Sequence, residues 1–130
     1  MRRPMALGLL ALLAACGGKE GPSPPQAGDL VVSYFQGGSA AGAILFTISG
    51  GVVENVTVRS GQQLQVSFSS PSAGTTKVIV TGALATGDII TLRVPDVTLF
   101  NDYVIHTDQV ADNLTFSLVD PSGHTFTVHR

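Results

Sequence analysis

From Leu30 onward, apolar and polar residues alternate with a period of two. The pattern is clearest over 63–69, where Leu64, Val66 and Phe68 alternate with glutamines and serines. Successive side chains of a strand point to opposite faces, so this segment predicts a strand with one buried and one solvated face. No segment after Leu30 shows the 3.6-residue period of an amphipathic helix of useful length.

Similar segments follow one another along the chain and are separated by Gly, Pro, Ser and Asp. We expect strands over 30–36, 43–49, 52–59, 63–69, 76–81 and 89–94. Residues 103–105 predict a short strand, and 107–113 predict one helical turn capped by Thr107. The end of the chain predicts a hairpin, because two alternating segments, 114–118 and 124–128, flank an Asp-Pro-Ser-Gly turn at 120–123.

About eight or nine short strands at turn-punctuated spacing favour an all-β fold, an antiparallel two-sheet β-sandwich. Two segments resemble strands of cohesin and carbohydrate-binding-module sandwiches. They are Gly-Ala-aliphatic-x-Phe-x-aliphatic at 42–48 and Leu-x-x-Gly-Asp-x-aliphatic at 84–90. The resemblance implies an Ig-like or cohesin-like jelly roll, and by analogy alone the binding of a protein or a glycan.

The N-terminus has the order of a secretory signal: Arg2 and Arg3, an apolar run, and small residues before Cys16. The run is shorter than the ~20 residues that a transmembrane helix needs. Its end, Leu-Ala-Ala-Cys at 13–16, resembles the lipobox of bacterial lipoproteins. The resemblance implies cleavage between Ala15 and Cys16 and acylation of Cys16. The alternative is a plain secretory signal that contains a cysteine.

The lipobox divides the chain into a signal peptide over 1–15, a lipidated cysteine and flexible Gly/Pro tether over 16–28, and one β-sandwich domain over 29–130. Fully extended, the tether would span roughly 35–40 Å. We expect a lipid-anchored protein of the bacterial cell envelope. Because Gly17 stands where an Asp commonly favours inner-membrane retention, the outer membrane is favoured if the host is Gram-negative.

Composition narrows the possible partners. Seven basic and nine acidic residues give a net charge of −2, and removal of Arg2 and Arg3 with the signal would make the charge about −4. Nucleic acid is an unsuitable partner, because a phosphate-binding surface needs clustered Lys and Arg. The single cysteine, committed to lipid, leaves no internal disulfide, so packing alone must hold the domain.

Residues with catalytic or metal-binding chemistry are few. His124 and His129 would lie on opposite faces of one strand, so they cannot share a metal ion without a bulge, and we expect these two and His106 to be structural or solvent-exposed. Asp102 and Asp108, with a third aspartate at 112, fit no EF-hand spacing and are expected to be solvated loop carboxylates rather than calcium ligands. No serine stands in a nucleophile motif or beside a plausible base. We therefore predict no enzyme activity, no metal and no cofactor.

The sequence leaves three functions open. The first is a non-enzymatic protein-binding or envelope-assembly module that uses an edge strand or a loop. The second is a glycan-binding module, which requires Tyr34 or Tyr103 to be exposed on a flat face, since the chain has no Trp. The third is a small hydrolase, which requires a concave pocket that gathers His106 with Asp102 or Asp108.

Overall fold

Nine β-strands and two 3-10 helices make up residues 23–130, the part of the chain that the computed structural model describes. The strands are β1 (Gly28–Gln36), β2 (Ala41–Ser49), β3 (Asn55–Val58), β4 (Leu64–Ser72), β5 (Thr75–Gly82), β6 (Gly87–Val94), β7 (Val104–Asp112), β8 (Leu118–Val119) and β9 (His124–His129). The 3-10 helices are η1 (Val97–Asp102) and η2 (Pro121–Gly123). Within these residues, no helix is long and apolar enough to cross a membrane.

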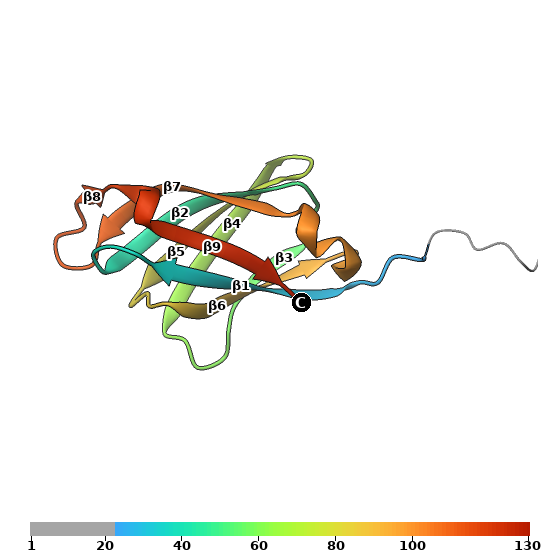
Figure 1. The fold of residues 1–130 in the computed structure, drawn as a ribbon, viewed down its shortest axis with the longest axis horizontal. Coiled ribbons are helices and arrows are strands. Elements are labelled where there is room, and N and C mark those ends of the chain that lie inside the picture. The colour runs from blue at the N-terminus through green and yellow to red at the C-terminus, as the bar shows by residue number, and fades with distance from the viewer. Residues whose placement is uncertain (1–22) are drawn as a thin grey trace, which may run out of the picture.

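The strands form two antiparallel sheets that pack face to face (Figure 1). One sheet has the order β3-β6-β1-β9 and the other the order β4-β5-β2-β7-β8. The predicted all-β two-sheet sandwich is therefore confirmed. The chain enters the first sheet at β1, at the end of the sandwich where η1 lies, and the loop between β7 and β8 lies at the opposite end (Figure 1).

The core lies between the sheets and comes from alternate residues of their central strands. It includes Leu30, Val32 and Tyr34 of β1 and Ile44, Phe46 and Ile48 of β2, all buried. An aromatic row joins the two layers. The ring centroid of Phe126 in β9 lies 4.3 Å from that of Phe46 and 5.3 Å from that of Tyr34. The central strands thus bury the apolar face that their period-two pattern predicts. β4 at the sheet edge does not bury its expected face fully, since Leu64 and Val66 are half-buried and Phe68 is exposed.

The predicted terminal hairpin is wrong. β8 pairs with β7 in the five-stranded sheet, whereas β9 pairs with β1 in the four-stranded sheet. The turn between them is formed as its residues suggest, since the Asp120 side chain accepts a hydrogen bond from Ser122 N at 3.0 Å. That turn carries the chain from one sheet to the other instead of folding it back on itself.

The predicted helical turn over 107–113 is also wrong, because β7 continues as a strand to Asp112 and pairs with β2. Its polar side chains are bonded to neighbouring strands. Thr107 Oγ1 donates to the carbonyl oxygen of His124 at 2.7 Å, and Asp108 Oδ2 accepts from Thr47 Oγ1 at 2.6 Å. These partners are distant in sequence, so the local pattern, which predicts a strand only over 103–105, did not indicate that the strand continues to Asp112.

Candidate functional site

Three large apolar side chains project from the loop between β7 and β8 and from the start of β8. Leu114 is 83% exposed, Phe116 64% and Leu118 67%. We call these three residues the apolar tip. The sequence pattern predicts a strand with a buried face here, but residues 114–117 form a loop at the end of the sandwich away from β1's first residue (Figure 1). Exposed apolar residues gathered at one place mark binding surfaces more often than scattered ones do.

Hydrogen bonds hold this loop in one shape. Asp112 Oδ2 accepts from the backbone N–H groups of Leu114 at 2.9 Å and Thr115 at 3.0 Å. The backbone closes the loop as well: Asp112 N donates to Ser117 O at 2.9 Å, and Phe116 N donates to Asp112 O at 3.0 Å. The loop is therefore ordered by its polar groups, while its apolar side chains remain in solvent.

Phe116 adopts a left-handed backbone conformation with φ of 57°, which is uncommon for a bulky residue. Its ring lies against Gly42, where an added Cβ would stand 2.9 Å from Phe116 Cε1. Beside the ring, Thr81, Gly82, Ala83 and other residues line a hollow of about 300 Å³. A strained backbone that exposes an aromatic ring is a reason to look for function at this position.

The surroundings of the apolar tip are acidic. Backbone hydrogen bonds from Thr115 and Leu114 lower the pKa of Asp112, and the backbone N–H of Ser122 lowers the pKa of Asp120. The segments at this end of the sandwich, 37–42, 81–86 and 112–123, contain no Lys, Arg or His. The apolar tip is thus flanked by negative charge at neutral pH, and within these segments no cation compensates it.

Both candidate ligand-binding tyrosines are in the core. Tyr34 is buried and its hydroxyl lies 2.7 Å from His124 Nδ1. Tyr103 is buried beneath Gly51, with its hydroxyl donating to Val52 O at 2.7 Å. Neither ring forms the exposed flat platform that a sugar-binding site requires.

His106 and Asp108 do come together, on the outer face of the five-stranded sheet. His106 Nδ1 lies 3.0 Å from Asp108 Oδ1, and Lys77 Nζ lies 3.4 Å from Asp108 Oδ2. Burial would raise the pKa of Asp108, but the hydrogen bonds from Thr47 and His106 and the charge of Lys77 lower it overall. The residues flank an open hollow of about 520 Å³, and Asp102 belongs to η1 and not to this group. Asp108 is bonded to Thr47 and Lys77. It therefore resembles an ion-pair partner and not a general base with a free oxygen.

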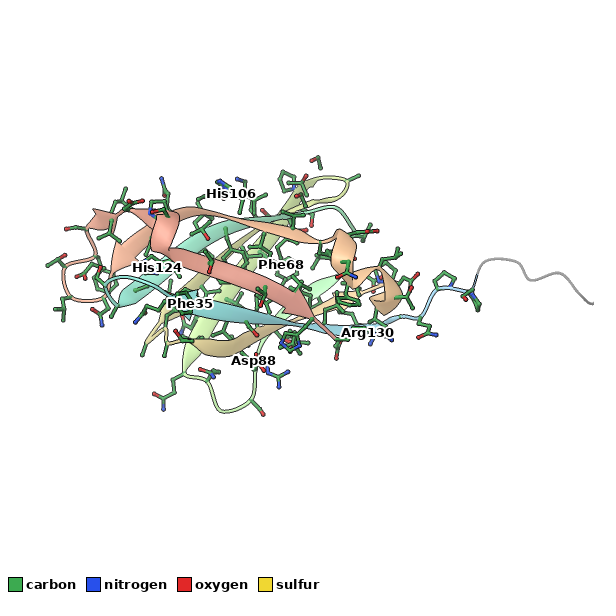
Figure 2. All side chains as sticks on the ribbon, in the orientation of Figure 1. Phe35, Phe68, Asp88, His106, His124 and Arg130 are labelled. Atoms are coloured by element: carbon green, nitrogen blue, oxygen red, sulfur yellow. The ribbon has the colours of Figure 1, made fainter. Side chains whose placement is uncertain are left out.

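Sequence reasoning missed one cluster, on the outer face of the four-stranded sheet. Ser33 Oγ hydrogen-bonds to Asp88 Oδ1 and lies 3.0 Å from His129 Nε2. The expectation that no serine has a base beside it is therefore wrong. The residues come from β1, β6 and β9, and Figure 2 shows Asp88 on the opposite side of the sandwich from His106. Their distance in sequence left no local signal.

This Ser-His-Asp cluster does not have the geometry of a hydrolytic triad. In a triad the serine and the aspartate bind different nitrogens of the histidine. Here Asp88 Oδ1 and Ser33 Oγ both lie near Nε2 of His129, at 3.4 and 3.0 Å, and Nδ1 is 3.3 Å from Arg130 O. Ser33 also donates to Asp88, so its proton is not directed to the imidazole. The hydrogen bonds from Ser33 and His129 lower the pKa of Asp88, as expected for a surface network.

His124 is buried between the sheets, and burial lowers its pKa, although the charge of Asp120 acts in the other direction. Since its folded-state pKa lies below 6.5, His124 contributes stability above that pH and loses it as the pH falls further. Asp112 and Asp120, whose pKa values are lowered, lose their contributions to stability only at more acidic pH, below 3.8.

We expect a lower melting temperature at pH 5.5 than at pH 7.5. His124→Gln should remove most of this difference in melting temperature, and His106→Gln, at an exposed position, should keep it. Thermal melts of the parent chain and of both variants at the two pH values will check this. The same change in melting temperature in all three proteins would show that His124 is not the group responsible.

Among residues 23–130, no three His, Cys, Asp or Glu side chains gather closely enough to hold a metal ion. The aspartates at 102, 108 and 112 do not converge. Cys16, the predicted lipid attachment site, lies outside the described residues, as does the cleavage position at Ala15. Comparisons of the chain with protein families, with curated proteins and with solved structures find no match.

Proposed function

We propose that this chain is a lipid-anchored, non-enzymatic protein-binding module of the bacterial cell envelope, and that the apolar tip is its binding surface. The observation that carries the proposal is the hydrogen-bonded loop that exposes Leu114, Phe116 and Leu118 together. Apolar side chains presented in one fixed conformation bind with little ordering cost, because the loop is already shaped. The cohesin-like resemblance agrees with a binding role, by analogy alone.

The chemistry of the tip indicates the kind of partner. Leucine and phenylalanine side chains fit an apolar pocket, and the carboxylates of Asp112 and Asp120 fit a basic rim around it. The glycan-binding alternative lacks support from the tyrosines, since both are buried. A protein with a basic-rimmed apolar pocket is therefore the partner that we propose.

The position of the tip suits an anchored protein. The chain enters the sandwich beside η1, and the apolar tip lies at the far end (Figure 1). Backbone bonds fix the entry point: Val97 N donates to Gln26 O at 2.8 Å. A protein held by lipid at Cys16 would thus have its attachment point and the tip at opposite ends of the sandwich, which leaves the tip free to meet a partner, with an outer-membrane location favoured in a Gram-negative host.

The anchor has a direct test. Cys16→Ser in the full chain removes the acyl acceptor, and we expect the variant to leave the membrane fraction of cells that express it, because the acyl chains supply the stable hold on the membrane. Immunoblots of membrane and soluble fractions measure the distribution. Persistence of the variant in the membrane fraction would show that Cys16 is not the anchor.

The binding surface is tested by site-specific photocrosslinking. A photoreactive amino acid at Leu114 of the full chain should give one protein adduct of defined mass in intact cells. Leu99, half-exposed in η1 at the other end of the sandwich, provides the matched control position and should give none. The adduct should weaken as salt concentration rises, because salt screens the acidic flank from a basic rim. Adducts to lipid alone, or the same adducts from both positions, would overturn the proposal.

A further inference from the structure

β4 is an edge strand of the five-stranded sheet. It pairs with β5 on one side, from Leu64 to Ser72, and no strand of residues 23–130 pairs with its other side. Most of its side chains are exposed, in contrast to the buried alternation of β2 at the centre of the same sheet. An edge strand offers a row of backbone N–H and C=O groups to a further strand.

This edge carries few of the features that prevent strands from pairing edge to edge. No charged residue occurs between Arg59 and Lys77, a stretch that contains the whole strand. Pro71 and a register shift between Ser69 and Ser72 interrupt one end only. Natural sheets commonly protect their edges with charges, proline or bulges, and the portion from Leu64 to Ser69 has none of these.

The side chains of this portion form two rows of different character. Val66 and Phe68 lie on the inner face, where Phe68 remains 38% exposed because the sheet ends there. Gln65, Ser67 and Ser69 are exposed on the outer face. On that outer face, Ser67 and Ser69 border a hollow of about 300 Å³, together with Leu45 and Ile79. A strand placed beside β4 would cover the open side of Phe68.

We infer that two copies of this chain pair their β4 edges in antiparallel fashion about a two-fold axis at Ser67, so that two five-stranded sheets become one of ten strands. In this register, Val66 faces the second copy's Phe68, and Gln65 faces its Ser69. Over residues 65–69, each apolar residue then meets an apolar residue and each polar residue a polar one. β-Branched and aromatic residues pair well across strands, and here no like charges oppose each other.

The second copy is the occupant that this edge fits, because residues 65–69 complement themselves and a two-fold contact closes after two chains. One strand pair buries less than the ~800 Å² per partner of a standard interface, so the contact is weak between freely diffusing chains. Attachment to one membrane surface would raise the effective concentration, and this step alone rests on the proposed lipid anchor. The edge argument itself does not depend on the apolar tip.

Disulfide capture tests the register in cells that express the full chain. In antiparallel pairs, facing Cβ atoms are about 4.5–5.5 Å apart, within reach of a disulfide after small adjustment. Ser67→Cys should therefore give a dimer on non-reducing gels after mild oxidation. The matched control is Thr125→Cys, an exposed position on β9 at the edge of the other sheet. The parent chain under the same oxidant reports any contribution from Cys16. Equal dimer yields at 67 and 125, or no dimer at 67, would overturn the inference.

Charge substitutions provide the second test. Ser67→Lys places two like charges opposite each other at the axis and should reduce co-purification of two differently tagged copies by about fivefold. Pairing the Ser67→Lys copy with a Ser67→Glu copy should restore it. Photocrosslinking from Leu114 should be unchanged in Ser67→Lys, so failure of the dimer and failure of the proposed tip function give different results. Co-purification unaffected by Ser67→Lys would exclude this interface.

Discussion

Replacing Gly50 by alanine should lower the free energy of unfolding by about 3–5 kcal/mol. Gly50 has φ of 95°, and a Cβ at this position would stand 1.9 Å from the carbonyl oxygen of Asp102. The glycine therefore provides both a left-handed backbone and the space in which η1 meets the end of β2. The overlap is with backbone, which cannot move aside as a flexible side chain can.

The measurement is the melting temperature, which should fall by about 12 °C or more for a domain of this size. Gly61→Ala is the matched control, because Gly61 has a similar φ of 87° but nothing within 4 Å of its added Cβ. It should cost about 1 kcal/mol, the strain without the overlap. If the two variants melt together, the close approach of Asp102 to Gly50 does not contribute to stability.

A similar close contact, of Tyr103 with Gly51, explains why the burial of Tyr103 could not be predicted from the sequence. Its ring lies over Gly51, where a Cβ would stand 2.6 Å from Cζ, and desolvation by burial raises its pKa. The Gly50-Gly51 pair marks the end of a strand in the sequence, but only the fold shows that a tyrosine about fifty residues later fills the space. An aromatic residue with a polar tip is equally suited to a surface platform and to a satisfied core position.

The strands of the first two-thirds of the chain could be predicted because each one has its own alternation and its own turn residues. The last third differs, because its strands depend on distant partners. Thr107 is bonded to His124, and Asp108 to Thr47, so the polar residues that suggested a helical turn are satisfied in a strand. At 120–123 the turn chemistry was right, but no local feature distinguishes a hairpin from a crossing between sheets.

The candidate site was hidden for a related reason. Alternation of Leu114, Phe116 and Leu118 predicts one buried face, but Asp112 bonds the backbone of the next residues and ends the strand pairing before that face can form. Period-two patterning reports which side chains share a face, and not whether a second sheet covers them. The Ser33–His129 contact joins residues near opposite ends of the described chain, which no spacing rule detects.

Phe116→Asn should separate binding from stability. Asparagine populates the left-handed region more readily than phenylalanine, so the substitution relieves backbone strain while it removes a ring that is mostly in solvent. We expect the free energy of unfolding to stay within about 1 kcal/mol of the parent value and to exceed that of Phe116→Ala, which keeps the strain. Thermal and chemical denaturation of the three proteins will check this order.

The affinity for the partner, unlike the stability, should fall strongly in Phe116→Asn. If Phe116 is the central aromatic anchor of the tip, its loss should cost at least about 2 kcal/mol, or roughly a thirtyfold weaker affinity for the protein captured at Leu114. Leu99→Asn, at a similarly exposed position in η1, is the control and should leave the affinity unchanged. Calorimetry with the purified partner and the full chain measures both. Phe116→Asn with parent stability and parent affinity would show that the exposed ring does not dock the partner. The unchanged stability would show that the fold is intact, so the result could not be attributed to a change elsewhere.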